Sequence, residues 1–188
     1  MTAADNSLVA VVDKRGSSLG DLPNTISIMS RRSTDNGKNW SEPVVVAQGG
    51  NGKTYGDPAV VLDKKTGNLI CMFVGDQGLW NATPYNRQGI YVSKSTDNGV
   101  SWSEPVAITD QVYANHSGWY AGFAGSGHGL CLKDGRLMFV LAIRATSATG
   151  VPLHNYAIYS DDGGDNWTLS TNAATTAGDL SLIHISEP

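Results

Sequence analysis

The chain has 188 residues, a length that fits one domain or part of a larger one, and its formal net charge is -4. A composition of 40% hydrophobic and 16% charged residues excludes a disordered chain and favours a packed soluble one. No basic cluster exceeds a pair such as Arg31-Arg32, so a nucleic-acid partner is not expected. No apolar run has the length of a membrane span, so no direct membrane span is expected either.

Short apolar runs separated by Gly, Asn, Asp, Ser and Thr follow one another along the chain, and each run predicts a β-strand. The predicted strands occupy residues 7–13, 25–33, 59–63, 69–74, 89–95, 129–133, 136–143 and 156–160. The sequences KKTGN (64–68) and DG (134–135) predict tight hairpin turns. No stretch keeps a helical period, so the predicted fold class is all-β. Cys71 and Cys131 lie within strand-like runs, which favours buried free thiols over the alternative of a disulfide.

One phrase occurs three times. RRSTDNGKNWSEP, SKSTDNGVSWSEP and the looser YSDDGGDNWTLS share the pattern Ser-x-Asp-x-Gly-x-x-Trp at 33–40, 95–102 and 160–167. The spacings are 62 residues (33 to 95) and 65 residues (95 to 160). Self-similarity at a nearly fixed period predicts an array of similar units, and the strands between the copies predict four-stranded antiparallel meanders arranged as propeller blades.

Every residue type in the phrase has a structural explanation. The glycine can adopt a positive φ, the aspartate can accept backbone N–H groups, and the tryptophan can fold under the turn. The alternative is that Asp35, Asp97 and Asp162 are catalytic carboxylates. Three equivalent turns on three blades would lie far from one another, so we interpret the phrase as scaffold.

The phrase is the Asp box of BNR repeats, and the chain from about residue 5 to about residue 179 resembles the bacterial exo-α-sialidases (neuraminidases). The resemblance implies a six-bladed β-propeller, of which residues 1–179 supply about three blades. Asp boxes also occur in other glycosidases, sorting receptors and photosystem assembly factors. A more specific feature is DKRGSSLGDLPN, because family members carry an arginine and, six residues later, an aspartate before a strand and the first Asp box. Arg15 and Asp21 have that spacing.

Two further stretches carry the resemblance: YGDPAVVLD, which contains Asp57, and GDQGLW, which contains Trp80. The resemblance implies that Asp21 is the catalytic acid that protonates the leaving oxygen, and that Arg15 binds substrate beside the family's arginine triad. It implies that Asp57 and Trp80 shape the pocket for the sugar's amide arm and O4. From the residues alone, a solvated turn carboxylate, a surface charge, a strand start and a core tryptophan are the respective alternatives.

The implied activity is hydrolysis of terminal sialic acids from glycoconjugates, with sialylated glycans or gangliosides as substrates. Sialidases use a tyrosine nucleophile; in the family a glutamate makes it more basic. Neither of these residues nor the arginine triad can be matched here, so we expect an N- and C-terminally truncated fragment that is inactive alone. No metal or cofactor is implied, since the four His lack ligand spacing. The full-length parent is expected to be secreted, periplasmic or at the cell surface.

The last nine residues, LSLIHISEP (180–188), do not continue the pattern. They match the translation of a transposase-type sequencing-library adapter, and we expect them to be an artefact. Glu187 and His184 are therefore given no role. Two other functional classes stay open from the sequence: a non-catalytic glycan-binding BNR-repeat protein, and an Asp-box hydrolase or receptor-type propeller of another specificity.

Overall fold

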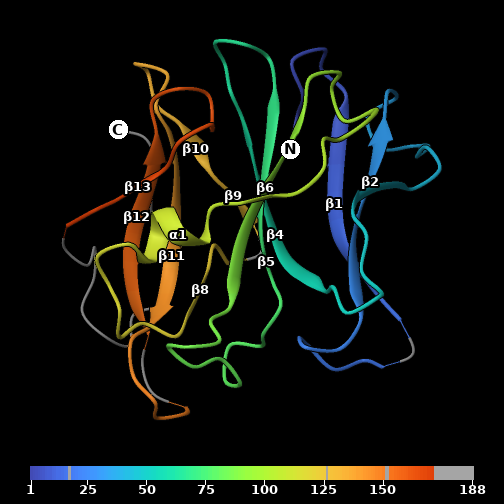
Figure 1. Cartoon of the computed structure of the whole chain (residues 1–188). Helices are drawn as coiled ribbons and strands as arrows, with labels where there is room; N and C mark the ends of the chain where they lie inside the picture. The colour runs from blue at the N-terminus through green and yellow to red at the C-terminus, as the bar shows by residue number, and fades with distance from the viewer. Residues whose placement is uncertain (17, 126, 151–152, 172–188) are drawn as a thin grey trace.

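The computed structural model describes residues 1–16, 18–125, 127–150 and 153–171. In these residues the chain forms three β-sheets and one short helix, which confirms the predicted all-β class. The sheets stand side by side, with the second between the first and the third (Figure 1). The end of the predicted propeller domain, 172–179, and the suspected artefact, 180–188, lie outside the described residues.

The first sheet has the order β1-β2-β3. β1 (Leu8–Arg15) pairs antiparallel with β2 (Ile26–Ser33) over its whole length, from Leu8 opposite Ser33 to Arg15 opposite Ile26. β3 (Val44–Ala47) completes the sheet on the other side of β2. Both faces of β2 are largely buried, whereas β1 alternates only weakly between buried and exposed residues.

The second sheet is a four-stranded antiparallel meander with one added strand. The meander consists of β4 (Tyr55–Leu62), β5 (Leu69–Gly75), β6 (Gly89–Ser95) and β7 (Val106–Ala107). Two hydrogen-bonded residues, β9 (Gly127–His128), extend it as a parallel strand beside β4. Every residue of β5 is buried, as expected for a strand covered by neighbours on both faces.

The third sheet is also a four-stranded antiparallel meander with one added strand. Its main path is β10 (Leu130–Cys131), β11 (Leu137–Arg144), β12 (His154–Ser160) and β13 (Thr168–Leu169). β8 (Ala121–Phe123) also pairs with β11, whereas β9, which lies between β8 and β10 in the chain, pairs with the second sheet. The predicted four-stranded antiparallel meander is therefore confirmed for the second and third sheets, whereas in the described residues the first sheet has three strands.

The glycine-rich segment around β9 explains this crossing. The Gly129 N–H donates to the Val60 carbonyl of β4, and a Cβ at Gly129 would collide with the Met138 carbonyl of β11. Strand glycines mark such close backbone approaches. The segment thus bridges two sheets at a place where larger side chains would not fit.

One helix, α1 (Thr109–Tyr113), was not predicted, because five residues are too few to produce a helical period. The side chain of Gln111 accepts the backbone N–H of Trp167 at 2.7 Å, so α1 holds the third Asp box. In the described part of the chain, no helix reaches the length and apolar character that a membrane crossing needs.

Two hydrophobic clusters fill the spaces between the sheets. One cluster joins the first and second sheets through residues such as Val9, Ile28 and Phe73, and the other joins the second and third through residues such as Ile70 and Leu141. The two cysteines lie one in each cluster, both buried and free, which confirms the thiol interpretation. The sheets are therefore held face to face by continuous apolar packing.

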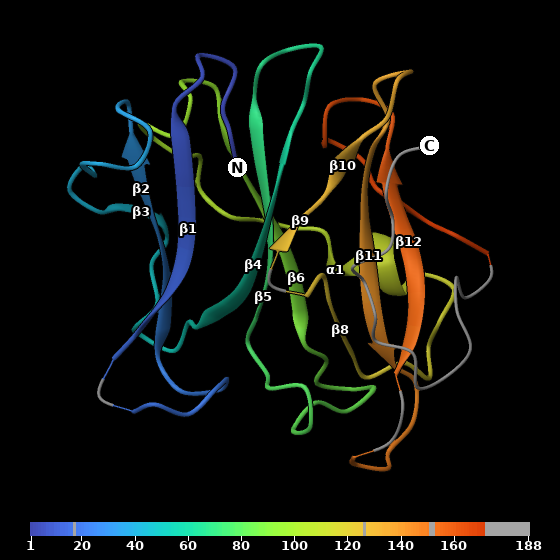
Figure 2. The ribbon, with the colours of Figure 1, turned by 180° about the vertical axis from the view of Figure 1, so that it is seen from behind.

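The three Asp boxes form the same turn. In the third, the Ser160 hydroxyl donates to Asp162 and accepts the Gly164 N–H, both at 2.8 Å, and the Asn166 N–H donates to Asp162 at 2.9 Å. The three glycines have φ of +83°, +84° and +85°. Figure 1 and Figure 2 show these turns at one end of the molecule, opposite the loops that follow β1 and β5. The structural interpretation of the phrase is confirmed.

The tryptophans of the three turns differ in burial. Trp167 is 4% exposed, and the indole N–H of Trp102 reaches into the first sheet to donate to Ser30 at 2.8 Å. Trp40 is 39% exposed, so the expected burial under the turn is wrong for this copy. The second and third turns rest on the preceding sheet, whereas no preceding sheet covers the first turn in the described residues.

This difference predicts unequal costs of truncation at equivalent positions. Trp167→Ala should lower the free energy of unfolding by about 3–5 kcal/mol, because it leaves a cavity in the core. Trp40→Ala, the matched control, should cost less than about 1.5 kcal/mol. Urea unfolding monitored by circular dichroism measures both. Equal losses would contradict the asymmetry in packing.

The third turn also predicts a pH dependence. Hydrogen bonds from Asn166 and Ser160 lower the pKa of Asp162 from 3.8 to about 2. Because folding lowers the pKa of Asp162, the ionised carboxylate stabilises the folded state at pH values above the pKa of the unfolded chain. This stabilisation is lost as the pH falls through about 2, the pKa in the folded state. Asp162→Asn should cost about 1 kcal/mol at pH 7, since the side chain is exposed, and the cost should shrink below pH 4. Exposed Glu42→Gln is the control, and a cost that is constant from pH 7 to pH 2 would contradict the assignment.

Candidate functional site

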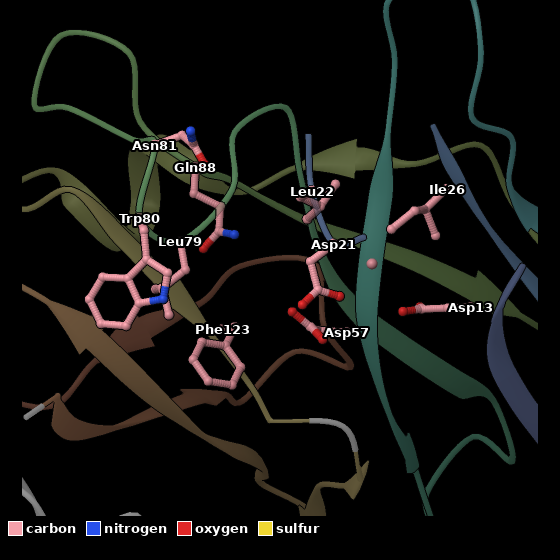
Figure 3. Close-up of a pocket in the computed structure, with 11 residues that line it drawn as sticks. Asp13, Asp21, Leu22, Ile26, Asp57, Leu79, Trp80, Asn81, Gln88 and Phe123 are labelled. Carbon is pink, nitrogen blue, oxygen red and sulfur yellow. The ribbon is translucent and has the colours of Figure 1, made fainter. Parts of the chain in front are cut away.

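A pocket of about 250 Å³ opens at the end of the sheets opposite the Asp boxes. It lies where the segment after β1, the start of β4, the loop 76–88 after β5, and β8 come together. The residues lining it are Asp13, Asp21, Leu22, Ile26, Gly56, Asp57, Leu79, Trp80, Asn81, Gln88 and Phe123 (Figure 3). Three of the four predicted site residues are among them, and the fourth, Arg15, contacts one of them.

Arg15 is the last residue of β1 and organises the segment that follows. Its Nη2 donates to Asp21 Oδ1 at 2.5 Å, and its Nη1 donates to the Leu19 carbonyl at 2.7 Å. The hydrogen bond to Asp21 raises the pKa of Arg15. The six-residue spacing therefore closes a loop through one guanidinium group, which presents the Asp21 carboxylate at the mouth of the pocket.

The Asp21 carboxylate is open to solvent. Its side chain is 81% exposed, so the described residues alone do not shield it from water. The Asp21 carbonyl accepts both the backbone N–H and the side-chain amide of Asn24, at 3.1 and 2.7 Å, which fixes the turn behind it. The loop is thus held from both sides while the carboxylate stays accessible to solvent.

Asp57 is placed in the pocket by an irregular backbone. It has a φ of +53° within β4, and the pairing with β5 shifts register between Gly56 and Ala59. A left-handed non-glycine residue in a strand costs conformational energy and is typical of functional sites. The carboxylates of Asp57 and Asp21 point toward one another, and the rings of Trp80 and Phe123 lie on the other side of the pocket (Figure 3).

Asp13 was not predicted as a site residue. Burial raises its pKa, repulsion by Asp57 adds to this, and the Arg15 guanidinium, 3.7 Å away, opposes it. The carboxylate accepts a backbone hydrogen bond from Asp57, while its Oδ1 is buried with no hydrogen-bond partner in the described residues. The period-2 geometry of a strand could have identified it, since Asp13 and Arg15 share one face of β1.

Trp80 lies on the loop 76–88 and is 43% exposed, so it lines the pocket rather than the core. The loop leans on the segment that carries Asp21, because a Cβ at Gly78 would overlap the Leu22 carbonyl. Gln88, at the end of the loop, is buried and also lines the pocket. Its Oε1 has no hydrogen-bond partner in the described residues, and no sequence pattern pointed to it.

The charges around the pocket are mostly negative. Asp13, Asp21 and Asp57 are balanced by one contacting guanidinium, that of Arg15. In the part of the chain that the structure describes, no three His, Cys, Asp or Glu side chains are arranged to hold a metal ion. The arrangement offers one solvent-facing acid, one cation beside it, hydrogen-bond acceptors, and an aromatic wall.

The chain is similar to several curated sialidases. It is 30% identical over 204 residues to a sialidase of Bacteroides fragilis, covering 98% of this chain and 36% of that protein. It is 34% identical over 199 residues to a sialidase of Micromonospora viridifaciens, covering 97% of this chain and 30% of that protein. The chain thus spans about a third of the length of these relatives.

Solved structures show the same fold. The Hadza microbial sialidase Hz136 matches with a TM-score of 0.82 at 29% identity, over 93% of this chain and 36% of that one. The NanB sialidase from Streptococcus pneumoniae matches with a TM-score of 0.77 over 95% of this chain and 44% of that one; at 16% identity it supports the fold alone. The three sheets are therefore blades of a sialidase-type β-propeller, which confirms the predicted architecture.

The model of the BNR repeat-like domain matches residues 1–183, nearly the whole chain. The relatives found independently are sialidases, which agrees with the resemblance seen in the sequence. This chain therefore belongs to the family of BNR repeat-like domains.

Proposed function

We propose that this chain forms part of the active site of an exo-α-sialidase, which hydrolyses terminal sialic acids from sialylated glycans or gangliosides. The observation that carries the proposal is the Arg15–Asp21 pair facing Asp57 and Trp80 across one pocket. The proposal concerns the protein that carries this chain at the relatives' length, since the chain spans 36% and 30% of two of them.

In this proposal Asp21 is the general acid. It stands at the pocket mouth, where it would meet the leaving oxygen of a sugar bound below it. A bound sugar would cover the exposed carboxylate and remove its water, which favours the protonated form. Arg15 steers the anionic substrate and holds Asp21 in place, because its planar guanidinium presents several donors at once.

Asp57 and Trp80 are proposed to recognise the sugar ring. The Asp57 carboxylate can accept hydrogen bonds from a hydroxyl or an amide N–H, and the indole of Trp80 offers an apolar wall for a methyl group. Together they suit a substrate that carries an acylated amine beside hydroxyl groups. The mechanism needs no metal or cofactor, since acid catalysis and a protein nucleophile are sufficient.

The nucleophile is assigned outside this chain. By the family resemblance it is a tyrosine with a glutamate partner, and the arginine triad completes the site. We therefore expect the 188-residue chain alone to be inactive, and the whole protein to be secreted, periplasmic or at the cell surface. Residues 180–188 have no part in the proposal and are proposed to be an artefact of sequencing.

A second function, non-catalytic glycan binding, is favoured by one observation. Asp21 is exposed and paired with Arg15, which suits a site that only binds a glycan through hydrogen bonds as well as one that transfers a proton. The two functions differ in turnover: a glycan-binding protein would bind sialosides saturably and release no sialic acid.

Replacing the proposed acid tests the catalytic role. In the complete protein, Asp21→Asn should lower kcat/KM on a natural sialoside by about 100- to 10,000-fold, because the leaving oxygen loses its proton donor. The loss should be much smaller on an aryl sialoside, whose leaving group departs without protonation. Steady-state kinetics on both substrates measure the difference.

Asp35→Asn, in the first Asp box at the other end of the molecule, is the matched control and should leave kcat/KM unchanged on both substrates. Equal losses on both substrates for Asp21→Asn would refute the role as acid. Saturable binding without any turnover by the unaltered protein would support the glycan-binding alternative.

The contact between the two loops gives a second test. Gly78→Ala would push loop 76–88 away from the Leu22 carbonyl and displace Trp80 relative to Asp21. We expect KM for sialosides to rise about 10-fold or more. Gly118→Ala is the control, since a Cβ there meets no heavy atom within 4 Å. An unchanged KM for Gly78→Ala would show that the loop contact does not shape the site.

A further inference from the structure

Arg144, the last residue of β11, is a buried cation without a carboxylate. Its side chain is among the largest fully buried ones, with 2% exposure. Within the described residues the ion pairs do not include it, and its Nε has no hydrogen-bond partner. Burial lowers the pKa of the group. An apolar residue would fill the same volume without the desolvation penalty, so the guanidinium needs a specific explanation.

The contacts of Arg144 converge on the loop that lines the pocket. Its Nη2 donates to the Ala82 carbonyl at 2.5 Å, and its guanidinium carbon lies 5.7 Å from the centre of the Trp80 ring. Both residues belong to loop 76–88. The guanidinium also lies 4.6 Å from the Tyr120 ring. A buried cation is therefore stabilised by one carbonyl and two π-faces, two of these three contacts coming from the loop.

Backbone hydrogen bonds tie the same residues together. The Tyr120 N–H donates to the Arg144 carbonyl at 3.0 Å, and the Gln88 N–H donates to the Tyr120 carbonyl at 3.2 Å. Gln88 ends the loop that contains Trp80 and Ala82. The third sheet thus holds this loop at its middle through the Arg144 side chain and at its end through Tyr120.

We propose that Arg144 is a positioning residue that fixes Trp80 and loop 76–88 as the wall of the sugar pocket. It acts through Trp80 and does not touch the substrate. The expected change in KM rests on the proposed sialidase function. The expected change in the position of Trp80 rests only on the contacts described above. Arginine suits this task because its planar group can donate to a carbonyl in its plane while its faces meet aromatic rings.

Arg136, which directly precedes the first residue of β11, gives a matched contrast. Its side chain is 38% exposed, forms two hydrogen bonds to Asp161 at 2.7 and 2.9 Å, and lies 4.2 Å from the Tyr159 ring centre. It combines the same cation–π contact with an ordinary surface ion pair, remote from the pocket. Replacing it removes a similar interaction without affecting loop 76–88.

The experiment uses the complete protein with Arg144→Met, Arg144→Lys, Trp80→Ala, the Arg144→Met/Trp80→Ala double variant, and Arg136→Met. Arg144→Met should raise KM for a sialoside about 10-fold with a smaller change in kcat, because the wall is displaced while the acid is not. In the Trp80→Ala background the same change should add little, since the positioned ring is gone. Arg136→Met should leave KM unchanged. Equal effects of Arg144→Met in both backgrounds would overturn the proposal.

A second readout does not depend on activity. The fluorescence of Trp80, taken as the difference between each protein and its Trp80→Phe counterpart, should become more accessible to acrylamide quenching in Arg144→Lys. The lysine variant keeps the charge and loses the planar contacts, so it tests positioning even if Arg144→Met does not fold. Unchanged quenching in Arg144→Lys would overturn the inference. If the unaltered protein releases no sialic acid, the proposed function fails, and the quenching result alone then decides the role of Arg144.

Discussion

The hydrogen bonds accepted by the Asp-box carboxylates hold the outer hairpin of each sheet, and the packing of one sheet on the next depends on these turns. The glycine of the second turn lies against Val9 of the first sheet, and the glycine of the third lies against Ile70 of the second. Trp102 donates to Ser30 across the first junction, and Lys94 binds Asp165 at 2.5 Å across the second. A turn that closes a hairpin within its own sheet therefore also fixes the neighbouring sheet. Because these contacts repeat from one sheet to the next, the array keeps a constant geometry at one end and leaves the other end free to vary.

The variable end is where the backbone departs from regular structure. Asp57 has a left-handed conformation inside a strand, and Gly78 packs against a carbonyl of another loop. Such conformations survive only where the surroundings determine them, and here the scaffold at the opposite end supplies that rigidity. The neighbouring carboxylates of Asp13 and Asp57 also need rigid surroundings to stay close together. Asp13 is kept partly buried beside Asp57, and their repulsion is offset mainly by Arg15. Stability is concentrated in the Asp-box turns and the apolar clusters, whereas strain and like charge are concentrated at the pocket.

The parts that the sequence predicts well are those governed by local patterns. The strand expected at 89–95 is β6 with the same limits, and the glycine and aspartate of each repeat perform the predicted tasks in the turn. The sequence links Arg15 and Asp21 through a spacing within one loop, and the two side chains contact one another beside the pocket. The features that were missed depend on distant partners. β9 joins a sheet other than that of its sequence neighbours, because glycines let the backbone cross. Arg144 donates to the Ala82 carbonyl of a loop 62 residues away in the chain, and no local sequence pattern predicts this contact.

The pocket therefore belongs to the junction of the sheets and not to any one blade. The first sheet contributes the Arg15–Asp21 pair, the second contributes Asp57 and the loop with Trp80, and the third contributes Phe123. The position of Asp21 relative to the aromatic wall is then set by how the sheets pack, to which the second and third Asp-box turns contribute through their contacts with the preceding sheet. Substitutions in the hydrophobic clusters between the sheets can thus alter recognition without touching the pocket, since cores transmit displacements with little compression. The Asp-box turns at one end thus fix the sheets, and the loops at the pocket end can differ in sequence from one sheet to the next.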